Sequence, residues 1–126
     1  MKLQSQITFF YYKNLEEAAR FYEDIFHLEI IQDQSMAKVY KLGKSYFGIV
    51  DGVKGSLKAQ DYNAAMLTML VDSVEDWCAY LEEKGVKCIK PCSCGKFAKS
   101  AFYKDPGGYV IEIQHFMNEE VHKEFE

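Results

Sequence analysis

Four cysteines are the residues of this chain best suited to metal or redox chemistry, and three of them lie close together. The segment Cys88-Ile-Lys-Pro-Cys92-Ser-Cys94-Gly carries three thiols, and Cys78 precedes it. A structural zinc site needs about four donors, usually as two spaced pairs. These cysteines lack that spacing, and the three histidines are scattered along the chain. We therefore expect unrelated thiols around one loop, and a soft-metal or redox role is the less favoured alternative.

No other motif specifies a chemistry directly. The sequence has no glycine-rich phosphate loop, and no serine or cysteine stands in a recognisable nucleophile motif. A functional site must therefore be assembled from side chains that the strands and helices bring together.

The composition limits the kinds of partner. The chain has 126 residues, 48% of them hydrophobic, which suits one domain with a buried core. Its net charge is −4 and it has no basic stripe, so we expect no nucleic-acid partner. No apolar run approaches the length of a membrane span, and residues 1–6 do not resemble a signal peptide. We expect a cytoplasmic protein with no membrane partner, whose cysteines are thiols.

The first half of the chain predicts a strand, a helix and three further strands. Asn14 is a good helix N-cap, and Glu17 three residues later completes a capping-box-like start. Apolar residues then recur at helical spacing as far as Ile25. The predicted strands are 6–12, 28–32, 36–42 and 45–50.

The second half predicts the same order of elements. Ser73 caps a helix that runs to about Lys84, and Gly85 ends it. We expect an irregular segment over 91–96 and a type II turn over Asp105–Gly108. The tail 118–126 suits a short surface helix. The predicted strands are 64–71, 86–90, 99–104 and 109–115.

This order reflects an internal repeat, in which Ile7–Glu23 can be placed over Met66–Glu82. The predicted fold class is α+β. Two βαβββ modules would form a curved mixed sheet with a concave cleft and with the helices on the outer face. We expect a single domain over 1–126, with modules at about 1–52 and 64–116, a linker over 53–63 and a tail over 117–126.

Three stretches carry a resemblance to a known family. They are the helix and strand entry of Lys13–Ile30, the strand–helix–Gly–Val pattern of Met66–Cys88, and the turn and strand of Asp105–Ile113. In these stretches the chain resembles the glyoxalase/bleomycin-resistance/extradiol-dioxygenase group, the vicinal oxygen chelate superfamily. The resemblance implies the paired-module fold and a homodimer, in which a partner chain completes the cleft. It does not fix the function, because one scaffold hosts many activities.

The resemblance also implies positions for a divalent metal on the concave face. Ile7 and Met66 stand at the two first-strand ligand positions, Gly48 or Ile49 at the fourth-strand position of the first half, and Glu112 at that of the second. Only Glu112 has a donor atom, whereas Zn²⁺ or Fe²⁺ needs at least three protein ligands. We therefore expect no metal, no other cofactor and no catalytic residue of the metal-dependent kind.

Alternation along strands predicts which side chains share the cleft with Glu112. The result is an apolar, partly aromatic groove with one carboxylate, which is typical of a small-molecule site. Glu112 is either an anchor for a cationic ligand, a general base, or a structural residue bonded to a tyrosine hydroxyl. The predicted ligand-binding residues are Ile7, Phe9, Tyr11, Met66, Thr68, Leu70, Val110, Glu112 and Gln114.

The function that we predict is metal-free binding, which would sequester a small aromatic or cationic compound in the cleft. Such a role would resemble antibiotic resistance by the bleomycin-binding members of the family. The alternative is a metal-dependent lyase, isomerase or dioxygenase of the same superfamily with non-standard ligands. A third possibility is a regulatory or interaction protein whose cleft is filled by side chains.

Overall fold

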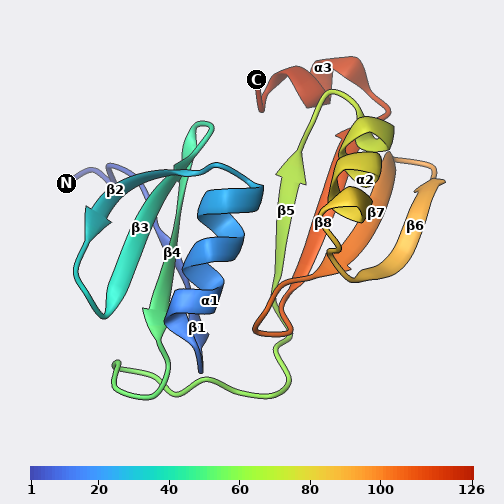
Figure 1. Cartoon of the computed structure of the whole chain (residues 1–126). Helices are drawn as coiled ribbons and strands as arrows, with labels where there is room; N and C mark the ends of the chain where they lie inside the picture. Colours follow the sequence, from blue (N-terminus) through green and yellow to red (C-terminus); the bar gives the residue numbers. More distant parts are fainter. The chain divides into compact units, whose positions relative to one another are not determined.

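The two predicted modules fold as two compact units, Met1–Asp61 and Tyr62–Glu126, in a computed structural model that describes all residues from 1 to 126 (Figure 1). Each unit contains a four-stranded mixed sheet and a helix that packs on one face of it. The α+β class and the doubled βαβββ order are confirmed, and the eight strands divide into two sheets of four.

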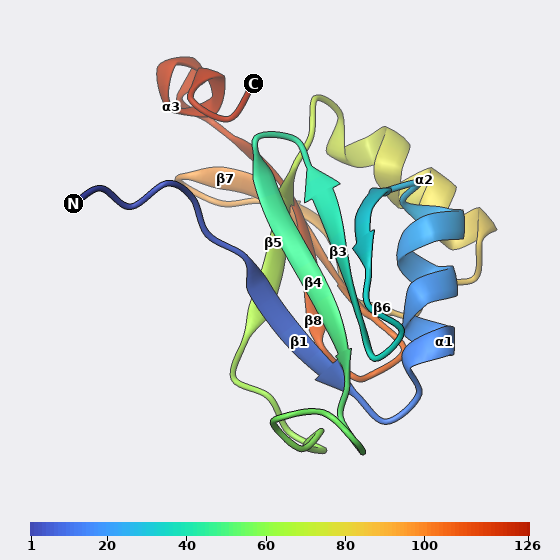
Figure 2. The ribbon, with the colours of Figure 1, turned by 90° about the vertical axis from the view of Figure 1, so that its left-hand side faces the viewer.

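In the first unit, the sheet order is β1-β4-β3-β2, with β1 parallel to β4 and the other pairs antiparallel. Helix α1 and the π-helical turn that follows it cover one face of this sheet (Figure 2). The elements are β1 (Thr8–Tyr12), α1 (Leu15–Arg20), the π-helical turn (Phe21–Ile25), β2 (Glu29–Asp33), β3 (Ala37–Leu42) and β4 (Ser45–Asp51).

The predicted cap begins the helix of the first unit. Asn14 accepts a hydrogen bond from the backbone N–H of Glu17 at 3.1 Å, which satisfies one of the free donors of the first turn. The helix buries its apolar face on an aromatic core, where the rings of Tyr22 and Phe47 lie 4.9 Å apart and those of Phe10 and Phe47 lie 5.2 Å apart.

The second unit repeats this plan with the sheet order β5-β8-β7-β6. Its helix begins where Ser73 accepts from the N–H of Asp76 at 3.2 Å, and it ends before Gly85, whose φ is +73°. No helix in the structure is long and apolar enough to cross a membrane. The elements are β5 (Met66–Leu70), α2 (Val74–Glu83), β6 (Cys88–Cys94), β7 (Ala98–Lys104), β8 (Val110–Phe116) and α3 (Glu119–Lys123).

The predicted irregular segment 91–96 is partly wrong, because β6 continues through Pro91 to Cys94. Proline disfavours strands since it has no N–H to donate, but β6 is an edge strand, where one side of the backbone is unpaired. The pairing with β7 also shifts register between Cys88 and Lys90 and between Lys90 and Ser93. Bulges of this kind accommodate a residue that cannot join the ladder.

The predicted type II turn at Asp105–Gly108 is also wrong. A type II turn needs a positive φ at its third residue, Gly107, but the positive φ of +84° belongs to Gly108. Asp105 closes the turn by accepting the N–H of Gly108 on its carbonyl at 3.0 Å and those of Gly107 and Tyr109 on its carboxylate at 2.9 Å each. Aspartate at the first position and glycine at the fourth favour a type I turn.

Candidate small-molecule site

The sheet of the second unit has one face against α2 and one face without a helix, which we call the open face. Ile111 and Ile113 on β8 are fully buried on the helix side, so their neighbours point to the open face. The register pairs Met66 with Val110, Thr68 with Glu112 and Leu70 with Gln114. The six residues predicted from this half therefore lie together in three adjacent rows.

Glu112 is held on the open face by neutral donors. Its side chain is 7% exposed. The hydroxyl of Thr68 donates to Oε1 at 2.7 Å, and the amide of Gln114 donates to Oε2 at 3.0 Å. The sequence suggested a tyrosine hydroxyl as the structural partner, but the partners are these two neighbours. Because both oxygens have a donor, the carboxylate can stay buried without a cation from a ligand.

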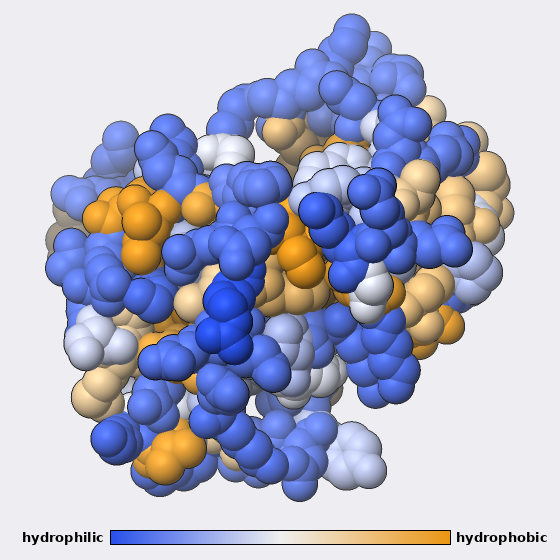
Figure 3. Space-filling model, viewed as in Figure 1, coloured by the Kyte–Doolittle hydropathy of each residue, from blue (hydrophilic) through white to orange (hydrophobic).

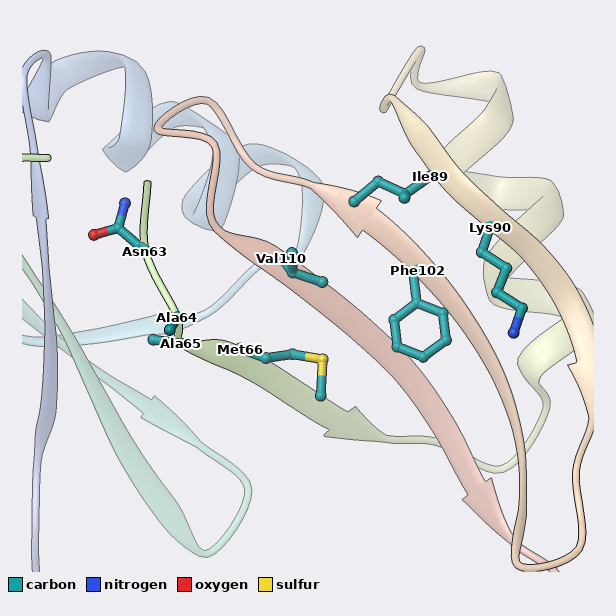
Figure 4. A pocket seen from close by; sticks show the side chains of 8 residues that line it. All are labelled: Asn63, Ala64, Ala65, Met66, Ile89, Lys90, Phe102 and Val110. Atoms are coloured by element: carbon teal, nitrogen blue, oxygen red, sulfur yellow. The ribbon is translucent and has the colours of Figure 1, made fainter. Parts of the chain in front are cut away.

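A pocket of about 520 Å³ opens at the Met66 end of this face (Figure 4). This volume falls in the range of small-molecule sites, and most of the lining is apolar. Met66, Val110, Phe102 and Lys90 contribute one side chain from each strand of the sheet. The pocket is lined by Asn63, Ala64, Ala65, Met66, Ile89, Lys90, Phe102 and Val110.

Sequence reasoning placed only Met66 and Val110 of this lining. Phe102 stands directly opposite Glu112 on β7, and Lys90 stands opposite Phe102 on β6. Alternation along the predicted strand 99–104 could have placed Phe102 on the same face of the sheet as Ser100. Lys90 ends the predicted strand 86–90, but β6 continues to Cys94 and pairs Lys90 with Phe102.

In the first unit, the three predicted residues lie at and before β1. Ile7 precedes the strand, whereas Phe9 and Tyr11 lie within it, two residues apart on the same face. The hydroxyls of Tyr11 and Ser56 lie 2.9 Å apart and share a hydrogen bond. That these residues line one cleft with those of the second unit stays a prediction.

The register resolves which residue occupies the fourth-strand metal position of the first half. The repeat places Phe9 over Thr68, and Phe9 pairs with Gly48 as Thr68 pairs with Glu112. Gly48 is therefore the counterpart of Glu112. A Cβ at position 48 would collide with the ring of Phe9, so that ring occupies the space of a side chain.

The residues present do not fit the metal that the resemblance implies. Ile7 and Met66 have hydrocarbon and thioether side chains, Gly48 has none, and Glu112 alone offers a carboxylate. One carboxylate is too few for a first-row metal, which takes three or more protein donors.

One other group of possible donors exists, in which atoms of Asp72, His122 and Glu126 lie within 4.8 Å of one another. His122 accepts the N–H of Phe116 on Nδ1 at 3.2 Å, which leaves the ring proton of the neutral imidazole on Nε2. That nitrogen then has no lone pair for a metal, so this group is not a metal centre in the conformation seen.

Among the cysteines, Cys92 is poorly suited to nucleophilic or metal chemistry. Cys92 donates weakly to the carboxylate of Glu75 over 3.9 Å. Burial, followed by the nearby Cys78 and Glu75, raises the pKa of the Cys92 thiol. A raised pKa keeps this cysteine protonated and makes it a weak nucleophile and metal ligand.

The chain thus folds as two βαβββ units, each with a four-stranded mixed sheet and a helix against one of its faces. The chain belongs to the Glyoxalase/Bleomycin resistance protein/Dioxygenase superfamily, whose family model matches residues 5–113. The resemblance inferred from the sequence is thus confirmed.

Two solved structures show the same fold. A lactoylglutathione lyase from Agrobacterium tumefaciens matches with a TM-score of 0.75 and 18% identity, over 89% of this chain and 92% of that one. A fosfomycin resistance protein from Listeria monocytogenes matches with a TM-score of 0.76 and 19% identity, over 95% of this chain and 98% of that one.

One curated relative has a local match at higher identity. A lactoylglutathione lyase from Schizosaccharomyces pombe is 51% identical over 43 residues, which are 34% of this chain. The match spans only 14% of the length of that protein.

Proposed function

We propose that the chain binds a small, partly aromatic molecule on the open face of the second unit and uses no metal at the family positions. The pocket beside Met66, Val110 and Phe102 supplies the apolar contacts. Glu112, fixed by Thr68 and Gln114, supplies a polar group of defined orientation next to it.

The observation that carries this proposal is the replacement of Glu112's counterpart by Gly48, with the ring of Phe9 over it. This arrangement removes a donor and fills its place with apolar surface. An apolar surface favours contact with an apolar body over coordination of a metal.

A lyase is the second candidate function, because the local match to the Schizosaccharomyces pombe enzyme reaches 51% identity. Elemental analysis of protein purified without chelator separates the two. Under the binding proposal we expect far less than one Zn, Ni, Mn or Fe per chain and no lactoylglutathione lyase activity. One metal per chain, together with lactoylglutathione lyase activity that is lost on chelation, would support the lyase instead.

The binding itself is tested with N-phenyl-1-naphthylamine, a neutral aromatic probe whose fluorescence rises in apolar sites. We expect saturable binding that Phe102→Ala weakens about tenfold, since the substitution removes an aromatic ring that lines the pocket. Phe97→Ala is the matched control, because Phe97 is 75% exposed and lies outside the pocket. Equal loss in both variants, or no binding by the native chain, would contradict the proposal.

The charge of Glu112 is tested separately. Glu112→Gln keeps the shape of the side chain and removes its charge. If the ligand is cationic, as the sequence suggested, calorimetry should show binding weakened by about 1–3 kcal/mol, the scale of a charge-assisted hydrogen bond. A neutral ligand should bind the variant as it binds the native chain.

A further inference from the structure

Lys90 is the one charged side chain that lines the pocket of the second unit. Its ammonium nitrogen lies 5.9 Å from the centroid of the Phe102 ring, which is within the range of a cation–π contact. None of the ion pairs in the structure uses this ammonium group. The pocket therefore presents a cation that has an aromatic neighbour and no anion.

The arrangement of residues across the sheet places this ammonium group relative to Phe102 and Glu112. Lys90, Phe102 and Glu112 stand opposite one another on β6, β7 and β8. Neighbouring strands are about 4.8 Å apart, so the backbones of Lys90 and Glu112 are separated by about 10 Å. The positive charge therefore lies at the β6 edge, with the aromatic ring between it and the carboxylate.

Glu112 does not compete for the same role. Both of its oxygens already accept hydrogen bonds from neutral donors, and its side chain is almost fully buried. Lys90, in contrast, is exposed at the pocket. Lys90 therefore lines the pocket as an accessible cation, whereas Glu112 is not among the lining residues.

We infer that the ligand of this pocket is an aromatic anion, such as an aryl carboxylate or sulfonate, with its acid group paired to Lys90 and its ring against Phe102, Met66 and Val110. The inference rests on the proposed function and specifies its ligand class. The apolar lining binds the ring, and the unpaired ammonium selects the charge through a charge-assisted hydrogen bond.

Two probes that share one skeleton test this inference. 1-Anilinonaphthalene-8-sulfonate carries a sulfonate, and N-phenyl-1-naphthylamine is the same molecule without it. We expect Lys90→Gln to raise the Kd of the sulfonate about tenfold and to change that of the neutral probe less than about twofold. Lys90→Glu should weaken the sulfonate further. Added salt should weaken binding of the sulfonate to the native chain but not to Lys90→Gln.

Lys84→Gln is the matched control. Lys84 also lies over a ring, 5.7 Å from the centroid of Tyr80, but outside the pocket, so its loss changes net charge equally. We expect it to leave both probes unaffected. Circular dichroism of each variant checks the fold.

The outcomes separate this inference from the proposed function. If the neutral probe binds in a manner sensitive to Phe102→Ala while Lys90→Gln leaves the sulfonate unchanged, or Lys84→Gln weakens it equally, only the inference is overturned. A preference for cationic compounds that Glu112→Gln abolishes would also overturn it. If neither probe binds, the proposed function fails and the inference fails with it.

Discussion

Gly48 and Phe9 depend on each other, since the ring of Phe9 covers the place of a side chain at position 48. We expect Gly48→Ala to lower the free energy of unfolding by about 1–3 kcal/mol, because the new methyl group forces the ring to move. Urea unfolding followed by circular dichroism measures the effect.

A double-mutant cycle tests the cause. In a Phe9→Ala background the ring is absent, so Gly48→Ala should cost much less than it does in the native chain. An equal cost in both backgrounds would show that backbone conformation at position 48, and not the ring, explains the effect.

The cysteines should differ in reactivity while contributing little to stability. Cys88 and Cys94 are exposed, whereas Cys92 is half-buried and has a raised pKa. With a thiol reagent at neutral pH, the two exposed cysteines should react before Cys92, since the thiolate is the reactive form. Mass spectrometry of the labelled peptides identifies the order, and first labelling at Cys92 would contradict it.

Replacing Cys92 and Cys94 together by serine should change the unfolding free energy by less than about 1 kcal/mol, because both lie on an edge strand and neither is fully buried. A large loss of stability, or of a bound metal, would show that the thiols form a site.

At the scale of elements, His115 on β8 connects helix α3 to Val71, the residue that follows β5. Its Nδ1 lies 2.8 Å from the carbonyl oxygen of Val71, and its Nε2 lies 3.3 Å from a carboxylate oxygen of Glu119. Both partners accept hydrogen bonds, so the doubly protonated ring satisfies both. The ring of His122 stacks on the ring of His115, with 3.7 Å between the ring centroids.

These contacts predict that α3 loosens as pH rises. The Val71 carbonyl, and then Glu119, raise the pKa of His115, with Asp72 adding to the effect and partial burial opposing it. A raised folded-state pKa gives stability that is complete below the unfolded value of about 6.5 and is lost as pH rises through the folded value. Hydrogen-exchange protection factors of α3 should fall over this range.

Two variants test the origin of this dependence. Glu119→Gln keeps a hydrogen-bonding side chain on α3 but removes the charge, so it should reduce the pH dependence. His115→Gln should abolish it. If the protection factors of α3 fall with pH in His115→Gln as they do in the native chain, another titrating group causes the effect.

Local signals explain which elements could be predicted from the sequence. The caps at Asn14 and Ser73 and the stop at Gly85 depend on residues within one helical turn, and each is confirmed. The turn type at Asp105–Gly108 could not be read, because two adjacent glycines both permit a positive φ.

The candidate site was less predictable because it depends on pairing across strands. Alternation places Glu112, Val110 and Gln114 on one face, but it cannot identify Thr68 as the hydrogen-bond donor opposite. It also left Gly48 and Ile49 as alternatives, since a shift of one residue reverses the face. The register with β1 decides for Gly48.

At the scale of the whole molecule, large hydrophobic side chains remain exposed in both units. Hydrophobic residues also show as separate patches on the otherwise hydrophilic face in Figure 3. Ile31 in the first unit and Met66 in the second are 50% and 49% exposed. Exposed apolar surface and unpaired sheet edges are commonly covered by another chain.

We therefore expect a homodimer in solution, as the sequence predicted. Light scattering coupled to size exclusion should give twice the chain mass of 14.6 kDa at micromolar concentration. Ile31→Lys should shift the equilibrium towards the monomer if that side chain lies in the interface, because burial of an unpaired lysine is costly. Lys44→Glu, an exposed charge change at a β-turn, is the control. A native species of 14.6 kDa at these concentrations would contradict the prediction. The exposed apolar side chains of each unit would then be in contact with water or with a ligand.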